Sequence, residues 1–237
     1  MFKLKKRKKN TTTTLARKLI TVANAKSVVS EQFKTIRTNI NFSMPDKDIK
    51  TLLITSSTPG EGKSTMSSNT AVVFAQENKK VLLIDADMRK PTVHHTFSLK
   101  NSVGLANLLT RQAKVEQAVQ KTEVEGLHII TSGPIPPNPA ELLASNMMSN
   151  LIDELSKQYD AIIFDAPPIL SVTDAQILSN NCDGTIIVVN SGVAEKAGVL
   201  KAKEALEQSQ ANILGVVLNN FKLERDHYYY QYYGSAE

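Results

Sequence analysis

Residues 51–65 read TLLITSSTPGEGKST, an apolar run that leads directly into a loop of small residues. The run predicts a buried strand, and a helical pattern follows the loop. Gly60 and Gly62 allow the loop to curl so that successive backbone N–H groups point toward phosphate oxygens. The N-terminus of the following helix adds a partial positive charge. The stretch therefore predicts a site for a nucleoside triphosphate at the end of a strand.

The loop fits the phosphate-binding pattern G-x-x-x-x-G-K-[ST] except at its first position, where Ser57 stands in place of glycine. Lys63 is expected to reach the β- and γ-phosphates, and the hydroxyl of Ser64 is expected to hold Mg²⁺. The residues expected to bind the nucleotide are Ser57, Thr58, Pro59, Gly60, Glu61, Gly62, Lys63, Ser64 and Thr65.

Six apolar runs alternate with helical patterns along the chain. The runs are continuous rather than alternating, which indicates strands that are buried on both faces of a sheet. This order predicts an α/β fold of the P-loop NTPase type, with a doubly wound, mostly parallel sheet and helices on both faces. The strands are expected at 51–55, 81–85, 127–131, 161–165, 185–189 and 213–218. The helices are expected near 63–77, 102–121, 140–158, 174–180 and 195–209, with an earlier one that begins at Ser30 as its N-cap.

Acidic side chains follow two of these strands. Asp85 ends the second strand, Asp87 follows it, and Asp165 ends another strand. Ligands of such sheets bind beyond the carboxyl ends of the strands, so three acids beside the phosphate loop predict a set that binds Mg²⁺ and handles a proton. Taken singly, each aspartate could also be a helix cap or turn residue. Asn219 and Asn220, at the end of the last strand, could contact adenine or form a turn.

The basic charge of the chain is concentrated at its N-terminus. The formal net charge is +5, whereas the first nine residues carry six Lys and Arg side chains, so the remainder is close to neutral. We expect residues 1–26 to be a disordered tail, which could rest on an anionic membrane surface, contact nucleic acid or simply be solvated. Nucleic acid is the least favoured of the three because no aromatic residues are interspersed with the lysines. A globular domain is expected over 27–221.

Composition excludes several classes of protein. No apolar run approaches the roughly 18 residues that a membrane-spanning helix needs, and no apolar segment of the kind found in secretory signals follows the basic N-terminus. Cys182 is the only cysteine, which excludes an intrachain disulfide and a cysteine-rich metal site and favours a cytoplasmic location.

The chain ends in a tyrosine-rich segment, 222–237. Five of its six tyrosines lie there, without the aliphatic residues that a core segment would carry. The clustered residues are Tyr228, Tyr229, Tyr230, Tyr232 and Tyr233.

Together, the stretches SSTPGEGKST, VLLIDADMRKP, IIFDAPP and GPIPPNPAELLAS (133–145), with the terminal tyrosines, resemble the bacterial tyrosine kinases (BY-kinases) of capsule and exopolysaccharide systems. The resemblance covers about residues 27–237 and is closest to the Gram-positive catalytic chains. It implies an ATP-dependent protein-tyrosine kinase that phosphorylates the C-terminal tyrosines of neighbouring subunits, as well as other proteins, and so regulates polysaccharide synthesis and export.

The resemblance also implies roles for individual residues. Lys63 would stabilise the transferring phosphoryl group, and Ser64, Asp87 and Asp165 would bind Mg²⁺. Asp85 would orient the tyrosine hydroxyl and accept its proton. Because a loose transition state needs little prior deprotonation, positioning and charge neutralisation should dominate.

The implied partners are other copies of the chain and membrane proteins. The family's E-x-x-R-x-x-R ring-contact motif is represented here by Glu31, Lys34 and Arg37, where lysine replaces the first arginine and loses its planar fork. A ring with tails exchanged between subunits, a separate transmembrane activator at the inner face of the membrane and a cognate tyrosine phosphatase are the expected partners.

The alternative interpretations use the same nucleotide site. A partitioning or division-site ATPase would act as a switch without phosphotransfer, but it would carry a further lysine at position 58, where this chain has Thr58. A non-catalytic module would bind ATP for shape alone. The switch leaves the tyrosine cluster unexplained, and the presence of Lys63, Asp85 and Asp87 together argues against the non-catalytic module. A eukaryotic-type kinase is excluded because neither H-R-D nor D-F-G occurs.

Overall fold

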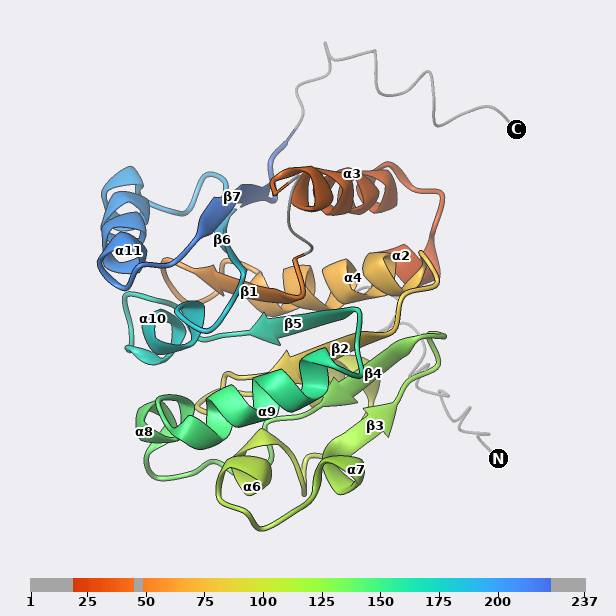
Figure 1. The fold of residues 1–237 in the computed structure, drawn as a ribbon. Helices are drawn as coiled ribbons and strands as arrows, with labels where there is room; N and C mark the ends of the chain where they lie inside the picture. The colour runs from red at the N-terminus through yellow and green to blue at the C-terminus, as the bar shows by residue number, and fades with distance from the viewer. Residues whose placement is uncertain (1–18, 45–48, 223–237) are drawn as a thin grey trace, which may run out of the picture.

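A computed structural model describes residues 19–44 and 49–222, which form a layered α/β fold (Figure 1). One seven-stranded sheet has the order β3-β4-β2-β5-β1-β6-β7. All neighbouring strands are parallel except β3, which is antiparallel to β4 at one edge. The strands are β1 (Thr51–Ser56), β2 (Val81–Asp85), β3 (Val119–Lys121), β4 (Leu127–Ile130), β5 (Ala161–Asp165), β6 (Gly184–Asn190) and β7 (Ile213–Asn219). The predicted doubly wound fold is confirmed.

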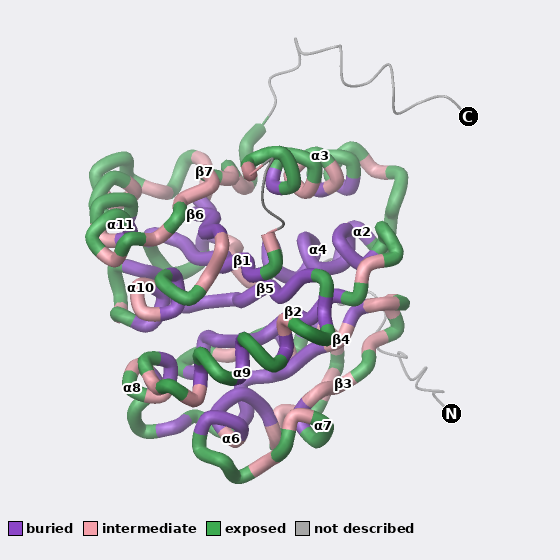
Figure 2. The backbone as a smooth tube through the Cα atoms, viewed as in Figure 1, coloured by how far each residue is buried: buried purple, intermediate pink, exposed green. Residues whose placement is uncertain are grey.

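Helices cover both faces of the sheet, and the central strands are buried between them (Figure 2). One hydrophobic cluster joins the sheet to α3 and α4, and the other joins it to α6, α8, α9, α10 and α11. The helices are α2 (Ile20–Ala23), α3 (Val28–Phe42), α4 (Lys63–Ala75), α5 (Val93–Phe97), α6 (Leu105–Leu109), α7 (Val115–Ala118), α8 (Pro139–Leu143), α9 (Asn146–Ser156), α10 (Asp174–Ser179) and α11 (Lys196–Gln208). Burial on both faces explains the uninterrupted apolar strands.

The predicted single helix over 102–121 is wrong. The segment contains two short helices, α6 and α7, followed by strand β3. Arg111, with φ of 59°, interrupts the helical path after α6, and residues 119–121 pair with the outer side of β4. Tertiary pairing therefore overrides the local helical pattern. The helix predicted over 140–158 is likewise divided, because Ser145 is extended between α8 and α9.

The start of the folded domain also differs from the prediction. Helix α3 has Ser27 rather than Ser30 as its N-cap, and the Ser27 hydroxyl accepts the N–H of Ser30 at 3.1 Å. Helix α2 lies within the predicted disordered tail, where Leu19 and Thr21 are buried. The Thr21 hydroxyl donates to Asn69 Oδ1 on α4 at 2.8 Å. These contacts make Leu19 and Thr21 part of the folded domain, so the predicted boundary at residue 27 is wrong.

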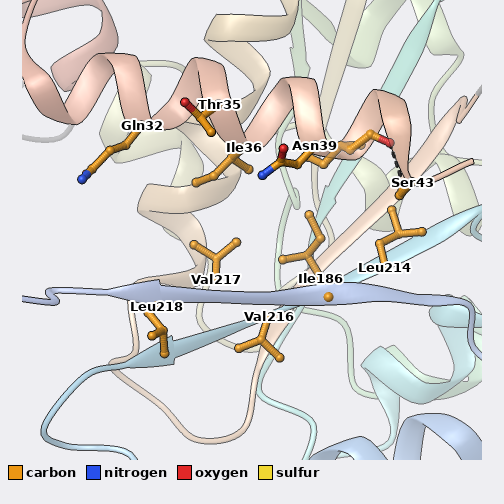
Figure 3. A pocket seen from close by; sticks show the side chains of 12 residues that line it. Gln32, Thr35, Ile36, Asn39, Ser43, Ile186, Leu214, Val216, Val217 and Leu218 are labelled. Carbon is orange, nitrogen blue, oxygen red and sulfur yellow. Dashed lines mark hydrogen bonds between the residues drawn. The ribbon is translucent and has the colours of Figure 1, made fainter. Parts of the chain in front are cut away.

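An apolar groove of about 580 Å³ lies between α3 and the outer strand β7 (Figure 3). Ile36 faces it from α3, and Val217 and Leu214 face it from β7. Among the residues that the structure describes, no charged side chain lines this groove. It is therefore unsuited to a triphosphate, and the polar site lies elsewhere, at the carboxyl edge of the sheet.

Candidate active site

Three adjacent strands bring the predicted polar residues together. Strand β5 lies between β1 and β2, and Asp85 is directly opposite Asp165 in the register. Strand β1 leads into the phosphate loop, which ends where α4 begins at Lys63. The loop, the two strand-end aspartates and Asp87 therefore meet at one edge of the sheet.

The phosphate loop depends on its two glycines. Gly60 and Gly62 have φ values of 86° and 94°, in the left-handed region that favours glycine. Gly62 is also confined, because a Cβ atom there would lie 2.1 Å from the side-chain nitrogen of Asn219. Substitution of Gly62 would therefore meet both backbone strain and a steric clash.

Glu61 was predicted to bind the nucleotide, but its side chain turns inward and organises the loop. It is 1% exposed. Its Oε1 accepts the hydroxyl of Ser57, the N–H of Thr58 at 2.6 Å and the Thr58 hydroxyl at 2.8 Å. Its Oε2 accepts the N–H of Asn190, at the end of β6, at 3.1 Å. Ser57, which replaces the first glycine of the pattern, thus has a structural role, because its hydroxyl donates to the Glu61 carboxylate.

The hydrogen bonds also fix the charge of Glu61. Burial alone would raise its pKa, but the donors from Ser57, Thr58 and Asn190 outweigh burial and hold the pKa below its ordinary value. Asn219 contributes to the same arrangement, since its side-chain amide donates to the Glu61 carbonyl at 2.9 Å. Glu61 and Asn219 therefore tie the phosphate loop to the ends of β6 and β7.

Lys63 lies between two of the predicted metal ligands. Its Nζ is 2.8 Å from Asp87 Oδ2 and 3.5 Å from Asp165 Oδ1, and it donates to the Ser64 hydroxyl at 3.4 Å. Burial alone would lower the pKa of Lys63, but the charges of Asp165 and Asp87 raise it above its ordinary value. The lysine is therefore a firmly charged ammonium ion at the mouth of the loop.

The two carboxylates that flank Lys63 have acceptor capacity to spare. Asp165 is fully buried, its Oδ1 accepts the Ser67 hydroxyl at 3.2 Å, and its Oδ2 has no hydrogen-bond partner among the described residues. Burial raises the pKa of Asp165, although Lys63 opposes that shift. Asp87 Oδ1 accepts the N–H of Lys90 at 3.0 Å. A buried carboxylate oxygen that accepts no hydrogen bond destabilises the fold unless a cation binds it.

These residues fit Mg²⁺. Within the described part of the chain, no group of three or more His, Cys, Asp or Glu side chains is arranged to hold a metal by itself. Mg²⁺ usually takes one or two protein carboxylates together with phosphate oxygens and water. Asp87, Asp165 and the hydroxyl of Ser64 would hold it, with the nucleotide and water supplying the remaining ligands.

Asp85 is less accessible than its predicted role requires. It is fully buried, and its Oδ2 accepts the N–H groups of Thr92 and Val93 at 3.1 and 3.0 Å, where α5 begins. Its Oδ1 has no hydrogen-bond partner among the described residues. Burial and then the charge of Asp165 raise its pKa well above the ordinary value. In this structure Asp85 caps α5, and its role in orienting a tyrosine hydroxyl remains a prediction.

The three predicted ring-contact residues do not share one exposed face. Glu31 and Lys34 form an exposed ion pair of 2.7 Å. Arg37 turns toward α4, where its Nη1 donates to the Val73 carbonyl at 2.6 Å and its Nε lies 2.9 Å from Glu77 Oε1. Their role in a ring remains a prediction.

Two sets of predicted residues lie outside the described ranges. These are the basic run within residues 1–18 and the five acceptor tyrosines, Tyr228 to Tyr233. In the ranges that are described, no helix is both long and apolar enough to cross a membrane.

Three contributors to the site were not predicted from the sequence. These are the inward carboxylate of Glu61, the N–H of Asn190 and the hydroxyl of Ser67, which donates to Asp165. Ser67 could have been found, because it lies four residues after Lys63 and so on the same helical face. Asn190 could not, because only the sheet order brings the end of β6 to the phosphate loop.

Comparisons with known proteins show which family the chain is similar to. The model of a family described as AAA domain matches residues 49–217. The chain is 52% identical over 230 residues to the tyrosine-protein kinase YwqD of Bacillus subtilis, covering 97% of each chain. It is 44% identical to the putative tyrosine-protein kinase CapB of Staphylococcus aureus, over 88% of this chain and 92% of that one. The crystal structure of the chimerical protein CapA2B2 matches with a TM-score of 0.85 and 45% identity, over 87% of this chain and 91% of the chimera.

Proposed function

Because this chain belongs to the bacterial tyrosine kinases of the capsule and exopolysaccharide type, we propose that it transfers the γ-phosphate of ATP to the C-terminal tyrosines of neighbouring copies. It is a tyrosine-protein kinase, and a kinase of this class uses ATP. The observation that carries the proposal is the position of Lys63, 2.8 Å from Asp87 and 3.5 Å from Asp165 at the mouth of the phosphate loop.

The residues of the loop edge are suited to phosphoryl transfer. Charge spreads over the oxygens of the transferring group in the transition state, so catalysis is mostly positioning and electrostatic stabilisation. Lys63 would leave the aspartates and contact the β- and γ-phosphates, and the N–H groups around Gly60 and Gly62 would hold the same phosphates. Mg²⁺, when bound by Asp87, Asp165 and Ser64, would offset the charge of the phosphate oxygens.

Strand β7 ends beside the phosphate loop, and the acceptor tyrosines follow it in the sequence. The side chain of Asn219, the last residue of β7, donates to the Glu61 carbonyl. The nine steps from Asn219 to Tyr228 can span at most about 30 Å, and we propose that the tail uses this reach to enter the site of an adjacent copy. Tethering raises the effective concentration of the acceptor, so weak contacts with the tyrosines suffice.

We further propose that the kinase works beneath a membrane with several partners. A separate transmembrane activator would recruit the chain to the cytoplasmic face, and the basic residues near the N-terminus would add attraction to anionic lipid. A cognate phosphatase would reset the tyrosines, and other proteins of capsule synthesis would be further substrates. The similarity of this chain to the chimerical protein CapA2B2 supports a second protein as a partner.

A switch ATPase of the division type is less well supported. The position where such a protein carries its additional lysine is Thr58, whose N–H and hydroxyl both donate to Glu61. Those bonds hold Thr58 to its own loop.

A two-component transfer experiment tests the proposal. One full-length chain carries Lys63→Met and keeps its tyrosines, and the other keeps Lys63 and has all five tail tyrosines replaced by Phe. The two differ by an affinity tag and are mixed with [γ-³²P]ATP and Mg²⁺. We expect alkali-stable label on the Lys63→Met chain only when its partner is present. Release of phosphate without labelled protein would instead support the ATPase switch. If wild-type chain in a separate reaction becomes labelled but the Lys63→Met chain in the mixture does not, transfer occurs within one copy.

A further inference from the structure

A second ion pair, which the sequence analysis did not assign, lies beside the site. Arg89 Nε donates to Asp174 Oδ2, and Arg89 Nη2 donates to Asp174 Oδ1, both at 2.9 Å. Asp174 is fully buried, and the side chain of Arg89 is 39% exposed. Two parallel bonds of this kind fix the relative orientation of both groups, as well as their distance.

The pair joins the two segments that carry the predicted metal ligands. Arg89 follows Asp87 by two residues in the segment after β2, and Asp174 begins α10 at the end of the segment after β5 and Asp165. The last backbone link between these strands is the N–H of Ala86 to the Asp165 carbonyl, at 2.9 Å. Beyond this point the two segments leave the sheet, and the Arg89–Asp174 pair connects them again.

The same segments are anchored to the phosphate loop. The N–H groups of Ile169 and Leu170 donate to the carbonyls of Ser56 and Ser57, at 2.9 and 3.3 Å. On the other side, Asp87 contacts Lys63 at the start of α4. The phosphate loop, the segment after β2 and the segment after β5 thus form a closed arrangement, in which the Arg89–Asp174 pair joins the segment after β2 to the segment after β5.

The spacing between these two segments matters because Mg²⁺ accepts little variation in geometry. Its ligands lie at about 2.0–2.1 Å in a near-ideal octahedron, and partners outside the ligand shell typically change metal affinity about 10–100-fold when they are removed. We propose that Arg89 and Asp174 are a positioning pair that holds the carboxylates of Asp87 and Asp165 at the separation that Mg²⁺ requires. The inference rests on the proposed metal role of those two aspartates.

The test measures ADP affinity of the full-length chain by calorimetry, across a series of Mg²⁺ concentrations and in EDTA. Arg89→Lys keeps the charge but loses the fork. We expect it to raise the Mg²⁺ concentration that gives half of the full enhancement of ADP affinity by about tenfold. ADP affinity in EDTA should stay within about twofold of wild type, because the phosphate loop is intact.

Two further variants keep the result interpretable. The double variant R89Q/D174N removes both charges together, which avoids an unpaired buried carboxylate, and it should show the same shift in Mg²⁺ dependence. The matched control is Asp183→Asn, which alters a hydrogen-bonded aspartate at the opposite edge of the sheet and should leave the Mg²⁺ dependence unchanged.

The outcomes are distinguishable. If the melting temperature of Arg89→Lys and of the double variant falls while their Mg²⁺ dependence equals that of wild type, the pair only stabilises the fold and the inference is wrong. If the wild-type chain itself binds ADP equally well with and without Mg²⁺, the metal role of Asp87 and Asp165 fails, and the role of the pair fails with it.

Discussion

Aspartates lie at both edges of the sheet, and the two edges use them differently. At the amino edge, Asp183 Oδ2 accepts the N–H groups of Lys50 and Thr51 and the Thr51 hydroxyl, at 3.1, 3.0 and 2.9 Å. Asp160, at the same edge, accepts the N–H of Lys80 at 2.7 Å. At the carboxyl edge, Asp85 and Asp165 are fully buried, and each keeps one oxygen without a partner among the described residues.

The difference separates structural acids from reactive ones. An aspartate that accepts the first N–H groups of a neighbouring strand holds that strand in place, and because Asp160 is exposed and Asp183 half-buried, water can meet their remaining acceptor capacity. A buried carboxylate with an unmade hydrogen bond is unfavourable for stability and persists where a ligand or reaction uses it. The position of an aspartate at the end of a strand is therefore not sufficient to identify the site. A buried aspartate oxygen that lacks a hydrogen bond and lies beside an ammonium group does identify it.

The largest effect should come from the ammonium group at the carboxyl edge. Lys63→Met removes the cation that contacts Asp87 and Asp165 and that would stabilise the transferring phosphoryl group. We expect the initial rate of tyrosine phosphorylation to fall by at least about 10²–10³-fold, the range seen when one such donor is lost. The measurement is ³²P incorporation at saturating ATP, and circular dichroism checks that the variant is folded. A rate within tenfold of wild type would contradict the role of Lys63.

The second prediction concerns the carboxylate that organises the phosphate loop. Glu61→Gln places an amide NH₂ group against either the N–H of Asn190 or the donors of Ser57 and Thr58. At least one buried donor then loses its acceptor, which costs about 1–3 kcal/mol. We expect that loss in the free energy of unfolding in urea, together with weaker ADP binding.

The pH dependence of the same variant has a defined sign. The pKa of Glu61 is lowered in the folded chain, so its stabilisation is present above the unfolded pKa, about 4.3. It is lost as the pH falls through the folded value, because the unfolded chain then binds the additional proton. The gap in stability between wild type and Glu61→Gln should therefore narrow below about pH 4. A gap that is constant from pH 7 down to pH 3 would show that the charge of Glu61 contributes nothing.

The carboxyl edge was predictable because its signals are local in sequence. Continuous apolar runs ending in Asp85 and Asp165, and a glycine loop before Lys63, are read directly from the chain. The direction of the Glu61 side chain is not, because its partner Asn190 is 129 residues away and arrives through the sheet order. The same reasoning explains the error over 102–121, where pairing of β3 with β4 decides the structure.

The smallest effect should come from a substitution at the amino edge of the sheet, which tests whether the aspartates there are only structural. Asp183→Asn keeps an oxygen that can accept the N–H of Thr51 but removes the charge that strengthens the bond. Hydrogen bonds to charged groups exceed neutral ones by roughly 1 kcal/mol, so we expect a loss of about that size in the free energy of unfolding. Because this edge lies at the other end of β1 from the phosphate loop, the rate of tyrosine phosphorylation should stay within about twofold of wild type. If the rate instead falls in proportion to that of Lys63→Met, the two edges are coupled, and unmade acceptor capacity does not by itself distinguish reactive aspartates from structural ones.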